Sequence, residues 1–119
     1  MKDEEHRLQC ACVRWFRYAY PHHLLYAVPN GGQRSVATAA RLKAEGVLAG
    51  VPDLFLSAAR GGFHGLYIEM KDGRKGRVSE SQRGVMERLT AEGYLCAVCR
   101  SFDEFRSTVE EYLRGAEIG

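Results

Sequence analysis

The chain has 119 residues, of which 45% are hydrophobic and 27% are charged, and its formal net charge is +2. This length predicts a single domain, residues 1–119, that is large enough for one hydrophobic core. The composition excludes an intrinsically disordered chain, the absence of any run of ~18 apolar residues excludes a membrane-spanning helix, and the small net charge does not by itself indicate a nucleic-acid binder.

The first half of the chain is predicted to alternate helix and strand. Residues 3–19 favour a helix because apolar side chains recur at spacings of three and four, which places them on one face. The residues on this face are Leu8, Ala11, Cys12, Trp15 and Ala19. Three elements follow: a strand at 24–28, a loop at 29–33, and a helix at 35–45 that Gly46 ends.

The second half predicts three strands and two helices. Short apolar runs at 53–56 and 66–70 are typical of buried strands, and residues 71–78 are predicted to form a turn or flexible loop. Two helices are expected, from Ser79 to Glu92 and from Ser101 to about Arg114, because a Gln or Glu lies three residues after each serine, the spacing of a capping box. A strand at 94–99 lies between them. The order α-β-α-β-β-α-β-α predicts an α/β fold with a mixed central sheet of about four strands flanked by helices.

Charged residues interrupt two of the predicted strands. Side chains alternate faces along a strand, so Glu69 and Lys71 project together on the face opposite to Met70. If the runs at 53–56 and 66–70 pair antiparallel, Asp53 lies near Glu69. Two neighbouring carboxylates repel each other unless a cation lies between them, and oxygen ligands suit Mg²⁺ or Mn²⁺. The pattern therefore indicates a metal site in which Lys71 stabilises charge on a phosphate or orients water.

A simpler interpretation of the same residues stays open at this point. Glu69 and Lys71 could be an exposed pair at the end of a strand, and Asp53 a turn residue after Gly50 and Pro52. Charged residues are common at such positions.

The motifs themselves resemble those of a known nuclease family. Pro52-Asp53, followed by Glu69-Met70-Lys71, resembles the signature of the PD-(D/E)xK nuclease superfamily. Further strings resemble its VRR-NUC branch, and together they span roughly residues 5–113. These strings are Glu5-His6-Arg7-Leu8-Gln9, Pro29-Asn30-Gly31-Gly32, Leu42 to Gly46, Gly50 to Leu54, Ile68 to Lys71, Ser79 with Gln82, and Gly93.

The resemblance implies a restriction-endonuclease-like α/β core and a Mg²⁺- or Mn²⁺-dependent phosphodiesterase that acts on DNA. Short standalone members of this family are expected to be homodimers that favour branched DNA such as four-way (Holliday) junctions. They resemble phage or prophage proteins, so a cytoplasmic location in a bacterial host is expected. The alternative function is a nucleic-acid-binding module with a degenerate nuclease fold.

The resemblance also implies roles for individual residues. Asp53 and Glu69 match the metal-binding carboxylates, the backbone carbonyl of Met70 would be a third ligand, and Lys71 matches the catalytic lysine. Glu5 matches a further ligand, direct or through water, although Glu4 stays an alternative. Gln82 matches a glutamine that meets water or phosphate near the metal, and it could instead, or in addition, complete the capping box with Ser79.

Basic and loop residues are candidates for DNA contacts. Thirteen of the seventeen cations are arginine, the side chain suited to bidentate phosphate contacts. Asn30, Gly31 and Gly32 could present backbone amides to phosphate or form a plain turn. The cations expected to line the DNA path are Arg34, Arg74, Lys75, Arg77 and Arg83. No pattern indicates base readout, so recognition of DNA shape rather than sequence is expected.

The four cysteines suggest a competing zinc or dithiol site, which geometry disfavours. Cys10 and Cys12 are two residues apart on a helix and diverge by ~200°. Cys96 and Cys99 are three residues apart on a strand and face opposite sides. Zinc needs convergent ligands, so these thiols are predicted to be reduced, small apolar side chains.

Overall fold

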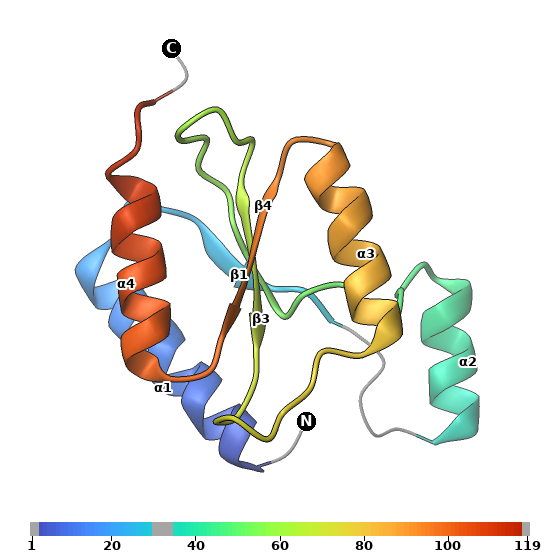
Figure 1. Cartoon of the computed structure of the whole chain (residues 1–119). Coiled ribbons are helices and arrows are strands. Elements are labelled where there is room, and N and C mark those ends of the chain that lie inside the picture. Colours follow the sequence, from blue (N-terminus) through green and yellow to red (C-terminus); the bar gives the residue numbers. More distant parts are fainter. Residues whose placement is uncertain (1–2, 30–34, 118–119) are drawn as a thin grey trace.

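The computed structural model describes residues 3–29 and 35–117 (Figure 1). Within them the elements are α1 (Asp3–Ala19), β1 (Leu25–Ala27), α2 (Val36–Ala44), β2 (Leu54–Leu56), β3 (Leu66–Met70), α3 (Glu80–Ala91), β4 (Leu95–Cys99) and α4 (Phe102–Leu113). This order confirms the predicted succession of helices and strands, and the ends differ by a residue at most positions. None of the described helices is both long and apolar enough to cross a membrane.

The strands form one mixed sheet in the order β1-β2-β3-β4. β1 pairs antiparallel with β2, and β2 pairs antiparallel with β3, with Leu54 opposite Ile68. β3 pairs parallel with β4, and Met70 lies opposite Cys99. A parallel neighbour requires a crossover connection, which here is α3. The predicted mixed α/β sheet is confirmed.

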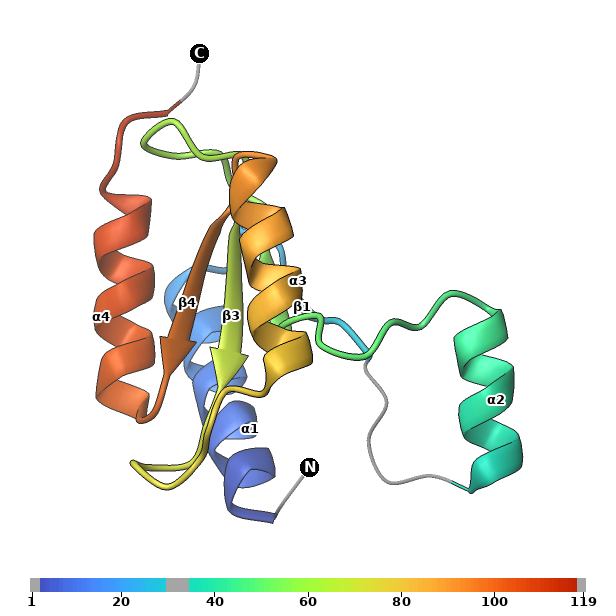
Figure 2. The ribbon, with the colours of Figure 1, turned by 45° about the vertical axis from the view of Figure 1, so that its right-hand side comes forward.

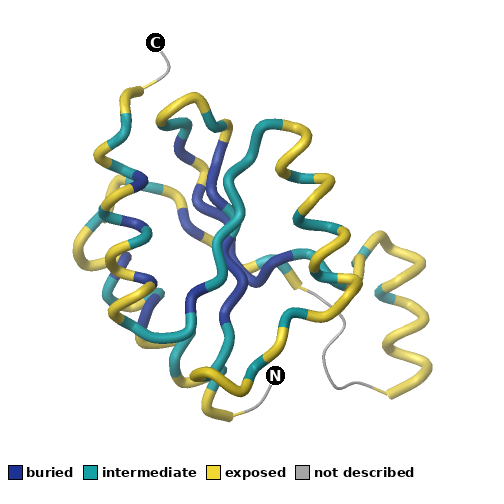
Figure 3. Tube along the Cα trace, viewed as in Figure 1, coloured by how far each residue is buried: buried dark blue, intermediate teal, exposed yellow. Residues whose placement is uncertain are grey.

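Helices cover the two faces of the sheet unequally. α1 and α4 pack on one face and α3 lies on the other, as the two views of the ribbon show (Figures 1 and 2). The hydrophobic core lies under α1 and α4, where the central strands are the most deeply buried part of the trace (Figure 3). Its fully buried members include Phe16, Leu66, Ile68, Met70 and Phe105. The alternation of β3 therefore sends its apolar residues into this core and leaves Glu69 on the face toward α3.

The buried face of α1 differs from the predicted one. Cys12 and Phe16 are fully buried, whereas Ala11 and Ala19 are exposed. Trp15 packs at the edge of the core, with its ring in edge contact with Phe102 and Phe105. A large aromatic ring gains more from burial than an alanine, so the helix turns Phe16 toward the sheet.

α2 stands apart from the layers around the sheet (Figures 1 and 2). Ser35 caps its first turn by accepting a hydrogen bond from the Thr38 amide, and no residue of the helix is buried. Val36 is 88% exposed. α2 therefore owes its form to capping and local propensity rather than to burial.

Candidate active site

The register of the sheet brings the two acidic residues together. Leu54 lies opposite Ile68, and continuing that antiparallel pairing by one residue places Asp53 beside Glu69. Both carboxylates are buried, with Asp53 7% and Glu69 2% exposed. Glu69 and Lys71 are therefore not an exposed pair at a strand end, and that part of the simpler interpretation is wrong. Asp53 does lie in a bend directly before β2, but it is buried there.

Asp53 is held by the backbone on both sides of the site. Its Oδ2 accepts a buried hydrogen bond of 2.7 Å from the amide of Met70, and its carbonyl accepts one of 2.8 Å from the amide of Val28. A carboxylate that accepts a backbone N–H has little rotational freedom. Asp53 is thus fixed where β1, β2 and β3 meet.

A close approach of two segments brings α3 to the same place. Gly50 has a positive φ of 97°, and a Cβ built on it would lie 2.7 Å from the carbonyl oxygen of Ser81. No side chain fits in that space, so glycine allows the segment leading to Asp53 to touch the first turn of α3. This contact helps to bring Gln82 near the carboxylates.

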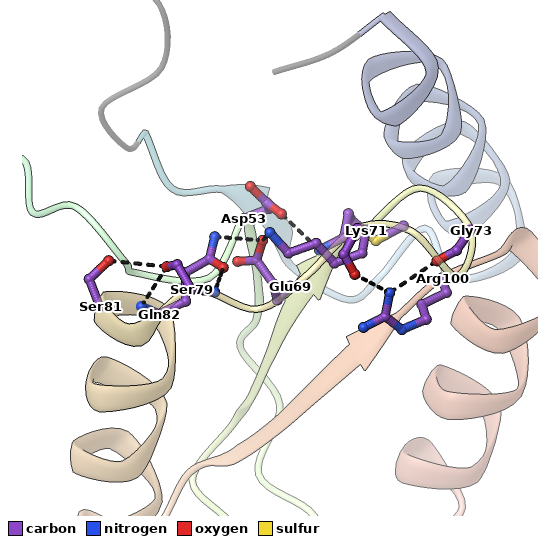
Figure 4. A network of polar contacts seen from close by, with 10 residues as sticks. Asp53, Glu69, Lys71, Gly73, Ser79, Ser81, Gln82 and Arg100 are labelled. Atoms are coloured by element: carbon purple, nitrogen blue, oxygen red, sulfur yellow. Dashed lines mark hydrogen bonds and ion pairs between the residues drawn. The ribbon is translucent and has the colours of Figure 1, made fainter.

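One oxygen of Glu69 is well partnered and the other is not (Figure 4). The Lys71 Nζ lies 3.5 Å from Glu69 Oε2, and Gln82 Nε2 donates a hydrogen bond of 3.1 Å to the same oxygen. Oε1 of Glu69 is buried and accepts no hydrogen bond from the described residues. A buried carboxylate oxygen without a partner is costly and indicates that a further group belongs at this point.

The raised pKa of Glu69 also indicates that the site holds more negative charge than Lys71 neutralises. Burial and then the neighbouring Asp53 raise the pKa of the Glu69 carboxyl, the ammonium of Lys71 lowers it, and together these effects bring the pKa from its ordinary value to about 8. Lys71 alone therefore does not compensate for two buried carboxylates. A cation at this position would relieve both causes of the shift.

The residues present fit a hard divalent cation. The unpartnered Glu69 Oε1, the Asp53 carboxylate and the backbone carbonyl of Met70 are all oxygen ligands of the kind that Mg²⁺ and Mn²⁺ take. Among residues 3–29 and 35–117, no group of three or more His, Cys, Asp or Glu side chains is placed to hold a metal. Glu5 is half-buried on α1 and does not complete such a group in this structure. Its role as a ligand stays a prediction.

Gln82 makes both of the contacts considered for it. Its Oε1 accepts a hydrogen bond of 2.9 Å from the Ser79 amide, and its own amide donates one of 3.1 Å to Ser79 Oγ, which confirms the capping box. Its Nε2 meanwhile donates to Glu69. The helix cap thus sets the direction of the side chain that reaches the site.

The predicted DNA contacts divide into two groups. Arg74, Lys75, Arg77 and Arg83 are exposed, the first three in the loop that follows Lys71 and the last on the first turn of α3. Asn30, Gly31 and Arg34, with Gly32, lie outside the described residues. The described cations therefore lie on the two segments that adjoin the carboxylates, the loop after Lys71 and the first turn of α3, and are open to phosphate.

Sequence reasoning missed Arg100. Its guanidinium donates hydrogen bonds to the carbonyls of Gly73, at 3.0 Å, and Gly76 (Figure 4). These partners lie more than twenty residues away along the chain. No local pattern could have indicated the contact, because an arginine after a strand has no characteristic partner.

Within each sequence pair the cysteines diverge, although Cys12 and Cys99 both lie in the hydrophobic core. Cys10 is exposed and Cys12 is buried, and all four cysteines are free thiols. Cys96 lies near the carbonyl of Met86 on α3, whereas Cys99 lies near the hydroxyl of Thr108 on α4. Burial raises the pKa of the Cys12 thiol to about 12, and the Cys96 and Cys99 pKa values are also raised by burial. The predicted divergence of these thiols is confirmed.

Comparisons with known proteins agree on one family. A family model for the VRR-NUC domain matches residues 2–103. A solved structure titled "VRR_NUC domain protein" is 26% identical with a TM-score of 0.82, over 100% of this chain and 95% of that one. Another, titled "VRR_NUC domain", shares the fold at 22% identity with a TM-score of 0.63, over 93% of this chain and 99% of that one. A comparison with curated proteins gave no match. The chain belongs to the VRR-NUC domain family, which assigns it a nuclease-type function.

Proposed function

We propose that the protein is a metal-dependent endonuclease that hydrolyses phosphodiester bonds in structured DNA, with four-way junctions as the favoured substrate. The observation that carries the proposal is Glu69. Its carboxylate is buried beside Asp53, one oxygen is bound by Lys71 and Gln82, and the other accepts no hydrogen bond from the described residues. Such an arrangement is costly for a purely structural residue.

Asp53, Glu69 and the carbonyl of Met70 would hold Mg²⁺ or Mn²⁺. When bound, such an ion supplies an acidified water and an electrostatic partner for the phosphate. The meeting of Asp53, Glu69 and Lys71 at one point supports placement in the PD-(D/E)xK superfamily. Glu5 of α1 is proposed as a further ligand, reached directly or through water.

Lys71 and Gln82 are the groups of this chain that would act on the reacting atoms. The Lys71 side chain is 12% exposed, so its ammonium is at the edge of solvent and of any phosphate that enters. It can donate to the attacking water or to the charge that develops on phosphate, a role concentrated in the transition state. Gln82 holds Glu69 in place and offers its amide to water near the phosphate.

The substrate follows from the surrounding charge and from symmetry. Arg74, Lys75, Arg77 and Arg83 offer phosphate contacts, and no described group is arranged for base readout, so we propose recognition of DNA shape. A four-way junction has two strands to cut symmetrically, and a twofold homodimer with two sites is the simplest protein that matches it.

The test uses a labelled four-way junction and a linear duplex formed by one labelled strand of that junction with its full complement. Each is incubated with Mg²⁺, Mn²⁺ or EDTA, and cleavage is followed on a denaturing gel. The wild-type protein should cut the junction faster than the duplex and only with a divalent metal. Asp53→Asn keeps an acceptor for the Met70 amide but removes the charge, and it should abolish cleavage.

The matched control for loss of one negative charge is Glu111→Gln, an exposed residue of α4. It should cleave like the wild type. Metal-independent cleavage, or normal turnover by Asp53→Asn, would remove the proposed function. Tight junction binding without any cleavage in Mg²⁺ or Mn²⁺ would favour a binding module with a degenerate nuclease fold.

A further inference from the structure

The loop that follows Lys71 is tied to the end of β4. β3 and β4 are parallel, so their last residues lie side by side. The Lys71 amide donates a hydrogen bond of 3.0 Å to the carbonyl of Cys99, and the Gly73 amide donates one of 3.3 Å to the carbonyl of Arg100. Arg100 is therefore at the point where the loop leaves the sheet.

Arg100 is itself anchored, and its side chain holds the loop at two points. Its backbone amide donates a hydrogen bond of 2.7 Å to Glu104 Oε1 in the first turn of α4. Its Nη1 donates to the carbonyls of Gly73 and Gly76, which come three residues apart in the loop (Figure 4). A charged donor shared by two carbonyls makes strong hydrogen bonds. The turn between Gly73 and Gly76 is thus clamped onto α4.

Gly76, in turn, packs against the side chain of Lys71. A Cβ built on Gly76 would lie 3.2 Å from Lys71 Cβ and 3.3 Å from Lys71 Cδ. These distances are shorter than ordinary contacts between carbon atoms. The backbone of Gly76 therefore forms a wall along the aliphatic stem of Lys71, and only glycine leaves the stem where it is.

The contact with Gly76 restricts the Lys71 side chain, which is otherwise flexible. Its four-carbon stem carries about 2 kcal/mol of rotamer entropy, and a single ion pair with Glu69 does not hold it firmly. Confinement of the stem restricts where Nζ can lie, and a misplacement of about 1 Å can cost about a hundredfold in rate. The loop therefore decides whether the ammonium stays at Glu69 Oε2.

We propose that Arg100 is a positioning residue for Lys71, acting through the carbonyl of Gly76. This inference rests on the proposed function, in which Lys71 acts on the reacting atoms. The Arg100 guanidinium binds backbone carbonyls of the loop, and Arg100 exerts its effect by holding Gly76 against the lysine stem. The same clamp sets the conformation of the loop that carries Arg74 and Lys75.

The first experiment removes the clamp and measures rate and affinity separately. Arg100→Met keeps side-chain length and removes the donors, and Arg114→Met, an exposed position at the end of α4, matches the loss of charge. Single-turnover cleavage of a saturating four-way junction with Mn²⁺ should fall at least about tenfold in Arg100→Met and remain at the wild-type rate in Arg114→Met. Affinity for the junction in Ca²⁺ should change by less than about threefold, since most phosphate contacts remain.

A double-mutant cycle then asks whether the effect passes through the lysine. In a Lys71→Ala background, Arg100→Met should cause no further loss of rate, because there is no ammonium left to position. An equal loss in both backgrounds, or a loss of affinity with an unchanged rate, would overturn the inference. Arg100 would then act independently or as a phosphate contact.

A second variant and a second readout guard against misfolding. Gly76→Ala pushes directly on the Lys71 stem and should lower the rate like Arg100→Met, whereas Gly84→Ala, where an added Cβ meets nothing within 4 Å, should not. In metal-free, DNA-free protein, Arg100→Met should speed hydrogen exchange at the amides of Gly73 and Gly76. Unchanged exchange would show that the clamp does not hold the loop and would overturn the inference.

The two proposals fail in different ways. If the wild-type protein cleaves no DNA with either metal, the proposed function is wrong and so is the effect of Arg100 on the rate, whereas hydrogen exchange at Gly73 and Gly76 still reports whether Arg100 holds the loop. If the wild type cleaves and both Arg100→Met and Gly76→Ala match its rate, only the positioning role falls.

Discussion

Glu69→Gln should make the metal-free protein more stable at alkaline pH while abolishing cleavage. The amide has the shape of the carboxyl group, so its oxygen can keep accepting from Gln82 Nε2. It removes the buried negative charge that lies beside Asp53. Active sites retain groups that destabilise the protein. The substitution therefore tests whether the same charge lowers the stability of the metal-free fold and is required for cleavage.

The pKa of Glu69 is raised from 4.5 to about 8. This shift sets how much Glu69→Gln should increase the free energy of unfolding, and at which pH. At ~1.4 kcal/mol per pKa unit, ionising Glu69 in the metal-free fold costs at most ~5 kcal/mol. Between these two values the folded protein binds a proton that the unfolded chain has released, so stability falls as pH rises. The stabilisation by Glu69→Gln should be absent near pH 4, grow through neutral pH and be complete above pH 8.

The assay is urea unfolding in EDTA at pH 5 and pH 8.5, followed by the fluorescence of Trp15, whose ring packs against Phe102 and Phe105. Glu69→Gln should gain ~2 kcal/mol or more over the wild type at pH 8.5 and much less at pH 5. Glu111→Gln should show no such difference. Added Mn²⁺ should stabilise the wild type at pH 8.5 more than the variant, because a cation that binds only the folded state raises its stability.

Equal or lower stability of Glu69→Gln at pH 8.5 in EDTA would refute this reasoning. It would mean that the pair of carboxylates is already compensated within the chain. The unpartnered Glu69 Oε1 would then be no argument for a cation.

Three further predictions concern the lysine, the cap and the assembly. Lys71→Ala should lower the single-turnover rate by about a hundredfold, ~3 kcal/mol, with little change in junction affinity measured by anisotropy in Ca²⁺. Ser79→Ala removes the hydroxyl that accepts from the Gln82 backbone amide and should cost ~1 kcal/mol in urea unfolding with little loss of rate. Gln82→Ala removes the other half of the capping box, the bond from the Ser79 amide, together with the contact with Glu69, and should lower both stability and rate. Light scattering at micromolar concentration should report a homodimer.

Each of these has a contrary result. Weak junction binding by Lys71→Ala with an unchanged rate would place the lysine in the basic surface. Equal rates for Ser79→Ala and Gln82→Ala would limit Gln82 to the helix cap. A monomer that still makes paired cuts in a junction would contradict the dimer.

Local signals in the sequence predicted the helices and strands and the residues of the candidate site. Hydrophobic periodicity, capping boxes and glycines are local signals. They predicted the ends of most helices and strands to within about one residue of the observed ends. Local reasoning also predicted that Asp53, Glu69 and Lys71 lie together, because two neighbouring antiparallel strands bring the start of one to the end of the other. The assignment of these residues to a catalytic site rather than to a strand-end pair came from the resemblance to the VRR-NUC family.

The surroundings of these residues could not be predicted, because they depend on how distant segments pack. The choice of Phe16 over Ala11 on α1 depends on the shape of the core, and the exposure of α2 depends on the absence of a neighbour within the described fold. The clamp of Arg100 on Gly76, and the raised pKa of Glu69, arise from contacts between segments distant in the chain. Such contacts leave no periodic trace in the sequence, because they depend on distances that exist only after the sheet has brought those segments together.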